Sequence, residues 1–162
     1  MSKLQTSTAI FLPNGAARIV VCLEGVRHGE LCGHWRSPYC KSAVHFDNII
    51  ELLSSMETFY NALEFPQSTL SLRSFGAKTG HTKTDIPKRK EVTKYMSDEV
   101  FSKERGEKAT FIVQVQFRQN ATWQGTVTWA EKNETCHFRS ALELLKMMDE
   151  TLSDTAENAQ QA

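Results

Sequence analysis

The chain has 162 residues, 40% of them hydrophobic, and a formal net charge of zero, which is the composition of an ordinary globular protein of one or two small domains. Nineteen basic residues balance nineteen acidic ones, so no overall charge favours nucleic acid or an anionic membrane. No apolar run approaches the roughly 18 residues of a spanning helix, and residues 9–12 are too few for a secretory signal of about 7–15 apolar residues. We therefore expect a cytoplasmic protein whose four cysteines are reduced thiols.

The first part of the chain alternates apolar and polar residues in short runs, which is typical of half-buried strands. These predicted strands cover residues 8–12, 19–23, 31–35 and 43–46. A helix is expected next, because Asn48 stands three residues before Glu51 in the pattern of a capping box. Its apolar residues form one stripe, made of Ile49, Leu52, Leu53, Met56 and Tyr60.

The middle of the chain predicts a strand over 69–75, a loop over 76–90 and a helix over 91–103. Residues 73–94 carry seven bases against two acids, a net charge of +5. The bases are Arg73, Lys78, Lys83, Lys88, Arg89, Lys90 and Lys94. Two interpretations stay open for this basic loop: a solvated linker that lies against the acidic helices, or a surface that contacts an anion or nucleic acid.

The second half repeats the pattern of the first at an offset of 92 residues. Residues 17–60 align with 109–152 without a gap, and nine of the 44 positions are identical. The identical pairs are Ala17/Ala109, Val21/Val113, Gly33/Gly125, His45/His137, Phe46/Phe138, Glu51/Glu143, Leu52/Leu144, Leu53/Leu145 and Met56/Met148. Because a mid-strand glycine, the strand pattern and the helix fall into register together, we interpret the similarity as an internal duplication.

Each copy is predicted as three strands followed by a helix, and in the second copy Ser140 and Glu143 form the capping box. The second set of strands covers 111–118, 123–129 and 135–138. The expected fold class is α+β, a tandem duplication of a βββα unit with antiparallel sheets related by a pseudo-two-fold axis. The expected division is 1–75 for the first unit with extra strands, 76–108 for the basic loop and a linker helix, 109–152 for the second unit, and 153–162 for a flexible tail. Whether the units share one core stays open.

Residue types that bind metals gather early in the chain, namely His28, Cys32, His34 and Cys40. On the predicted strands Cys32 and His34 point to the same face, where Cys22 on the neighbouring strand can face them. Zinc needs thiolate and imidazole ligands that converge tetrahedrally, but no CxxC or HxxxH spacing is present. The second copy has Gln114, Gln124 and Thr126 in place of Cys22, Cys32 and His34. We therefore predict a chance cluster, with no metal and no cofactor.

No motif for a reaction stands out elsewhere. His45 and His137 occupy equivalent positions before the two helices, and their recurrence favours a shared structural role. The sequence contains no Gly-rich phosphate loop, no G-x-S-x-G and no H-E-x-x-H motif. We expect that the protein is not an enzyme and has no catalytic residues; the competing hypothesis is a zinc enzyme built on the Cys/His cluster.

The second half, FIVQVQFRQNATWQGTVTWAEKNETCHFRSALELLKMMDETL, resembles short uncharacterised bacterial proteins with the same order of three strands and a helix. The resemblance centres on residues 117–120, 123–125 and 138–143, and it implies no particular activity. The βββα order also resembles, in topology, HicB-like antitoxins, a family that pairs with a toxin partner. Double-stranded-RNA-binding domains share this order, but the Lys-rich start of their last helix is missing here.

We therefore expect a non-catalytic, cytosolic binding or regulatory protein that acts through protein–protein contacts, such as an inhibitor, an antitoxin-like protein or a mobile-element accessory protein. The polar residues of the outer strands are the candidate contacts, namely Gln114, Gln116, Arg118 and Gln124, together with Thr126 and Thr128. The alternative is a nucleic-acid-binding protein that uses the basic loop 73–94. The partner, the pathway and the oligomeric state are not predicted by the sequence.

Overall fold

The computed structural model describes residues 14–68, 73, 75 and 94–160. Three strands, β1 (Arg18–Arg27), β2 (Glu30–Arg36) and β3 (Val44–Phe46), are followed by helix α1 (Ile49–Leu63). Three further strands, β4 (Ala109–Phe117), β5 (Gln124–Trp129) and β6 (Glu134–Phe138), are followed by helix α3 (Ala141–Gln160). The short 3-10 helix η1 (Asn14–Ala17) precedes β1, and helix α2 (Asp98–Ser102) lies between the two sets.

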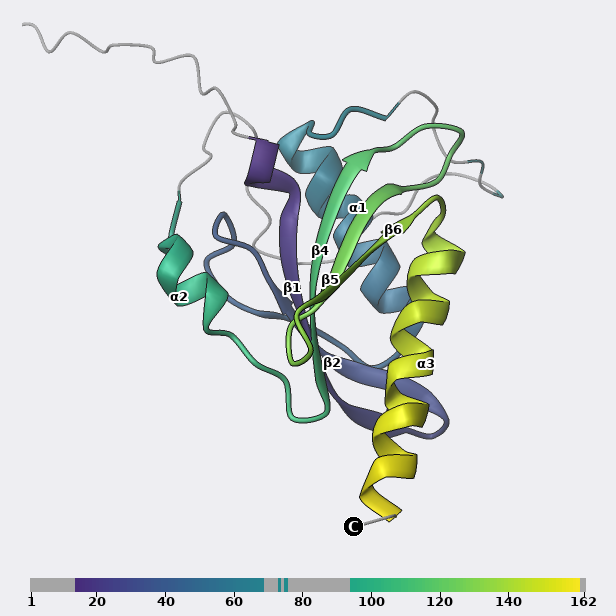
Figure 1. The fold of residues 1–162 in the computed structure, drawn as a ribbon. Helices are drawn as coiled ribbons and strands as arrows, with labels where there is room; N and C mark the ends of the chain where they lie inside the picture. The colour runs from purple at the N-terminus through teal and green to yellow at the C-terminus, as the bar shows by residue number, and fades with distance from the viewer. Residues whose placement is uncertain (1–13, 69–72, 74, 76–93, 161–162) are drawn as a thin grey trace, which may run out of the picture.

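All six strands form one antiparallel sheet with the order β3-β2-β1-β4-β5-β6 (Figure 1). The two sets of strands meet at the centre, where β1 pairs with β4 and Val20 stands opposite Ile112. The α+β class is thus confirmed, and the units share one core. Within the described ranges, no helix is both long and apolar enough to cross a bilayer.

The main core lies between the sheet and the two long helices, which pack on the same face. On the central strands, alternate residues point into it, such as Ile19 and Val21 from β1 and Phe111 and Val113 from β4. These side chains are at most 1% exposed. The alternation of apolar and polar residues in the sequence therefore matches the alternation of buried and outward-facing residues on the central strands. A smaller cluster on the other face consists of Val20, Cys22 and Phe101, with Met96 and Ile112 packed against it.

Both predicted helix starts are confirmed by their hydrogen bonds. The backbone N–H of Glu51 donates to Asn48 Oδ1 at 2.9 Å, and that of Glu143 donates to Ser140 Oγ at 3.1 Å. Each glutamate carboxylate also accepts from the backbone N–H of the residue before the cap, at 2.8 Å in the first helix and 2.7 Å in the second. The first two bonds satisfy N–H groups of the first helical turn that have no intrahelical partner, and the other two tie each glutamate to the residue before its cap.

Several predicted boundaries are corrected. The sequence predicts a helix over 91–103, but in the described part of this range the helix is the shorter α2. It begins after Ser97, because the Ser97 side chain accepts a hydrogen bond from the Val100 N–H and caps the helix there. Residues 153–160, expected as part of a flexible tail, continue helix α3 to Gln160. The strand 8–12, most of the strand 69–75 and the loop 76–90 lie outside the described residues.

The alternation predicted over 111–118 breaks at its end. The pairing of β4 with β5 shifts between Val115 and Phe117, so Gln116 is the extra residue of a β-bulge. A bulge reverses the phase of the side chains beyond it. Phe117 is therefore 56% exposed, whereas Arg118 is only 3% exposed and does not lie on the outer surface, as the sequence pattern suggested.

Two mid-strand glycines allow neighbouring strands to approach closely. A Cβ atom on Gly33 would lie 2.0 Å from the carbonyl oxygen of Cys22, and one on Gly125 would lie 2.0 Å from that of Gln114. These distances are shorter than any real Cβ contact, and the obstructing atoms belong to backbone. A side chain at either position would therefore push two paired strands apart.

We predict that Gly33→Ala lowers the free energy of unfolding by roughly 1–3 kcal/mol, the usual cost of forcing an extra group into a packed region. Gly25→Ala is the matched control, because a Cβ there meets no atom within 4 Å. Urea unfolding of both variants and the wild type is the measurement. Equal losses for the two variants would contradict the steric explanation.

Candidate functional site

The sheet face away from α1 and α3, here named the open face, carries two rows of neighbouring side chains. One row, named the polar row, crosses four strands and consists of Arg18, Gln114, Thr126 and His137. The other, named the Cys/His row, consists of Thr110, Cys22, His34 and His45. Paired residues of neighbouring strands stand close enough to interact, so each row is a continuous strip of functional groups.

The four predicted contact residues of the second unit do not form one surface. Gln114 is half-buried in the polar row, and Gln116 is exposed at the bulge. The amide of Gln124 is engaged locally, since its nitrogen donates to Gln119 O at 3.0 Å and its oxygen accepts from Gln119 N at 3.1 Å. With Arg118 buried, only Gln114 of the four belongs to the polar row.

Of the seven predicted basic residues, Arg73 and Lys94 lie in the described part of the chain, and both are exposed. Lys94 Nζ donates to Asp98 Oδ1 at 2.9 Å, and this hydrogen bond raises the pKa of the lysine. The other five bases, Lys78, Lys83, Lys88, Arg89 and Lys90, are outside the described residues. Nucleic-acid binding by the 73–94 loop therefore stays a prediction.

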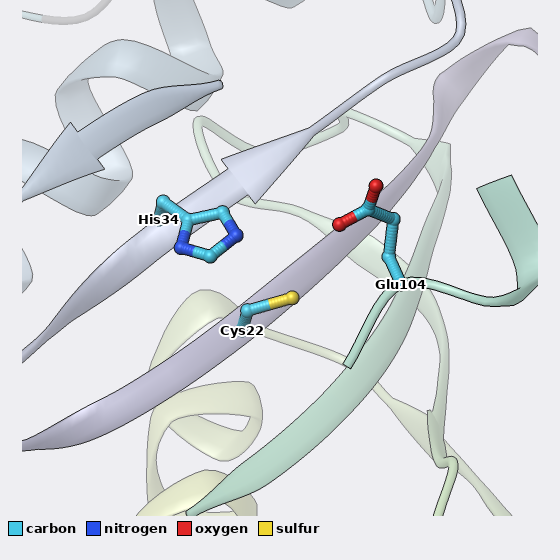
Figure 2. Close-up of side chains that lie close together, drawn as sticks. All are labelled: Cys22, His34 and Glu104. Atoms are coloured by element: carbon cyan, nitrogen blue, oxygen red, sulfur yellow. The ribbon is translucent and has the colours of Figure 1, made fainter. Parts of the chain in front are cut away.

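Within the Cys/His row, Cys22 and His34 face each other across β1 and β2, as the sequence suggested for these two. Glu104, from the segment after α2, joins them, and the sulfur, imidazole nitrogen and carboxylate oxygen of the three residues lie within 4.8 Å of one another. Figure 2 shows the three side chains turned toward a common point. We name this group the Cys22–His34–Glu104 cluster.

The surroundings of the cluster are electrostatically crowded. His34 Nδ1 and Glu24 Oε1 are 2.7 Å apart. Burial is the main cause that raises the pKa of the Cys22 thiol to about 12. The negative charge of Glu104 adds to the rise, and the positive charge of Arg36 lowers the pKa. The thiol is therefore neutral near pH 7 unless a cation takes the place of its proton.

The order thiol, imidazole, carboxylate is also that of a nucleophile activated by a base that a third group orients. Such a nucleophile must meet its substrate, and its thiolate is the reactive form. Cys22 is 0% exposed, and the pKa of its thiol is raised. Both properties argue against covalent catalysis by Cys22 and favour a role inside the fold.

A buried polar network that the sequence pattern missed joins β4 to α1. Arg118 donates to Pro66 O at 2.6 Å, to Asn61 Oδ1 at 2.7 Å and to Glu57 Oε1 at 3.1 Å. Trp123 Nε1 donates to the other oxygen of the Glu57 carboxylate at 2.7 Å. The network borders an open cavity of about 340 Å³ between α1 and the start of α3. Because Arg118 Nε, Arg118 Nη1 and Trp123 Nε1 all donate to protein acceptors, the arrangement supports a structural role.

The chain matches no family model, no curated protein and no solved structure with which it was compared. The resemblances of the second half to short bacterial proteins, and of the topology to HicB-like antitoxins, therefore stay predictions of the sequence. What the protein does has to be inferred from its open face and from the residues on it.

We predict that Arg118→Met lowers the free energy of unfolding by about 3 kcal/mol, because it leaves the acceptors of a buried ion pair without their cation. Arg139→Met is the matched control, since Arg139 also pairs with a glutamate, at 2.6 Å, but its side chain is 88% exposed. The control should leave stability at the wild-type level, as solvent screens exposed pairs. The free energy of unfolding of both variants and the wild type is measured by denaturant unfolding. Equal losses for the two variants would contradict the burial of the Arg118 ion pair.

We predict that one cysteine reacts first in the native protein. Cys136 is exposed, whereas Cys22, Cys32 and Cys40 are buried. Burial also raises the pKa of the Cys40 thiol to about 12, which leaves almost no thiolate at neutral pH. A short native pulse of iodoacetamide, followed by mass spectrometry, should modify Cys136 alone, and the same pulse in denaturant should modify all four. Labelling of Cys40 at the rate of Cys136 would contradict this.

Proposed function

We propose that the chain is a non-catalytic binding protein that acts through protein–protein contacts, and that the open face along the polar row, from Arg18 on β1 to His137 on β6, is its contact surface. The observation that carries the proposal is the placement of both long helices on one face of the sheet. On the other face, the polar row ends in half-buried Thr126 and exposed His137. An antiparallel sheet with one solvated face is stable, and its polar side chains are available to a partner.

The next row on this face is also rich in hydrogen-bonding groups. Thr128 and Thr135 stand opposite each other, with their hydroxyl oxygens 2.8 Å apart. At the opposite end of the polar row, Arg18 is exposed and makes no ion pair within the described residues. Direct hydrogen bonds spread over a contact area are typical of protein interfaces.

A cavity of about 220 Å³ adjoins Arg18 on the same face, between the sheet and α2. Its lining combines the aromatic side chains of Tyr39 and Phe101 with Arg18 and with the ion pair of Lys94 and Asp98. Interfaces concentrate their binding energy where a large side chain fills a pocket, surrounded by polar contacts. We therefore propose a partner that inserts an apolar side chain here and places a carboxylate against Arg18.

The same proposal includes descent of the two βββα units from one ancestral unit, related by a pseudo-two-fold axis between β1 and β4. Val20 and Ile112, which pair at the centre, are 92 positions apart. The pairs of β4 with β5 follow those of β1 with β2 at this offset, and the ladders shift at corresponding places, after Leu23 and after Val115. Chain topology and pairing register are harder to match by chance than an amphipathic helix, so they support the proposal.

The two halves of the open face differ in chemistry, which supports a division of roles. At the positions where the first unit has Cys22 and His34, the second has Gln114 and Thr126. The second half carries neutral polar groups at these positions. The first half carries a thiol and an imidazole there.

The test uses the tagged full-length chain to capture proteins from a lysate of its cell of origin. We expect a specific protein whose recovery falls at least tenfold for Arg18→Ala and for His137→Glu, because both change exposed ends of the polar row. His45→Glu is the matched control, since His45 is exposed at the equivalent position of the first unit, and it should retain the partner.

Two outcomes would count against the proposal. Equal recovery by all variants would remove the open face as the contact surface. The second outcome would favour nucleic-acid binding by the 73–94 loop. In that case nuclease treatment removes the captured protein, and the pure chain binds DNA or RNA with an affinity that falls steeply as salt rises.

A further inference from the structure

The Cys22–His34–Glu104 cluster has no part in the proposed contact surface, and its composition is that of a metal site. Zinc in proteins is held by thiolate, imidazole and carboxylate ligands, at about 2.3 Å for sulfur and about 2.0 Å for nitrogen and oxygen. Tetrahedral geometry then places ligand atoms about 3.5 Å apart. The three ligand atoms here already lie within 4.8 Å of one another, so small side-chain rotations bring them to that spacing.

We propose that Cys22, His34 and Glu104 bind one divalent metal ion of the zinc class, with water as the fourth ligand. Two ligands come from the paired strands β1 and β2, and the third comes from the segment after α2. The bound ion would therefore fasten this segment to the open face. Catalytic zinc sites also combine three protein ligands with one water, but the burial of Cys22 assigns this site a structural task.

His34 is held in the orientation that a metal ligand needs. Its Nδ1 is 2.7 Å from Glu24 Oε1, so the carboxylate accepts the Nδ1–H proton. This hydrogen bond selects the tautomer whose Nε2 carries the free lone pair. A carboxylate behind the imidazole is the usual outer partner of metal-binding histidines, since it fixes the ring and makes it a better donor.

The charges around Cys22 favour a cation. Three carboxylates, those of Glu24, Glu104 and Glu131, act on its thiol, against the single guanidinium of Arg36. Their net charge is minus two before the Cys22 thiol loses its proton, so the field at the sulfur favours a cation. Arg36 Nε is 3.6 Å from Glu104 Oε1, and this buried nitrogen has no hydrogen-bond partner in the described part of the chain. Arg36 therefore does not tie up Glu104 with a hydrogen bond.

The donor types decide the class of metal. Thiolate and imidazole ligands suit zinc, whereas magnesium and calcium prefer oxygen ligands alone. On binding, the Cys22 thiol gives its proton to solvent, and the sulfur coordinates the ion in its place. The second unit has Gln114 and Thr126 at the equivalent positions, so we expect one site per chain.

The test is a titration of the chelator-treated full-length chain with Co²⁺, which reports its ligands spectroscopically. We expect saturation at one equivalent, a near-ultraviolet charge-transfer band that requires a thiolate ligand, and visible bands of tetrahedral intensity. Zinc should abolish these bands and raise the melting temperature, because it binds the folded state. Gel-filtered protein should retain one zinc per chain by elemental analysis.

Substitutions assign the ligands. Glu104→Gln and His34→Gln should each weaken Co²⁺ binding at least tenfold, and Cys22→Ser should remove the charge-transfer band. Cys136→Ser is the matched thiol control and His137→Gln the matched imidazole control, since both residues are exposed and outside the cluster. Both controls should bind like the wild type.

Glu104→Gln decides the outcome, because Glu104 lies outside the sheet and is half-buried, so the variant is expected to fold. Absence of the charge-transfer band in the wild type would overturn the proposal. Unchanged binding by Glu104→Gln and His34→Gln would overturn it as well, as would loss of binding with Cys136→Ser or His137→Gln, which would assign the ion to surface groups.

Discussion

The pairing of β1 with β4 is the interaction on which the rest of the structure depends. A unit of three strands and one helix leaves an edge strand with unpaired N–H and C=O groups, and the ladder from Arg18 to Leu23 joins two such edges. It turns two small sheets into one sheet with a common core, to which Val21 and Val113 both contribute. A small unit buries too little surface to be stable alone, so the shared core explains why the units fold together.

This central ladder also decides where function can reside. Because it places α1 and α3 on the same face, the other face of the six strands is left for other contacts; within the described part of the chain, the short helix α2 packs there through Phe101. The open face thus offers two regions on one backbone framework. We propose a partner surface for one, along the polar row, and a metal site for the other, at the Cys22–His34–Glu104 cluster.

The two β-bulges convert a regular sheet into these special environments. In β1 the shift between Leu23 and Gly25 makes Glu24 the extra residue, and its carboxylate lies against His34. In β4 the corresponding shift brings Arg118 inward to Glu57, where it ties the strand to α1. A bulge moves one side chain out of the regular alternation, so it can assemble a polar group that a perfect ladder would separate.

The sequence alone determined the local features: the strand alternation, the two helix starts at Asn48 and Ser140, and the repeat at an offset of 92. These features depend on residues two to four positions apart, which a linear pattern records. Of the candidate site, it correctly paired Cys22 with His34 and placed Gln114 on the outer side of its strand.

Only the tertiary structure decided the rest. Arg118 points inward because a β-bulge precedes it in the chain. The position of a bulge depends on how two strands pair, which the composition of one strand does not determine. The tertiary structure also brought Glu104 to Cys22 and His34 from a segment far along the chain, a contact that no spacing motif encodes. Burial, strand register and ligand convergence are long-range properties, created when distant segments share one core, and for that reason the function of the open face could be inferred only from the folded chain.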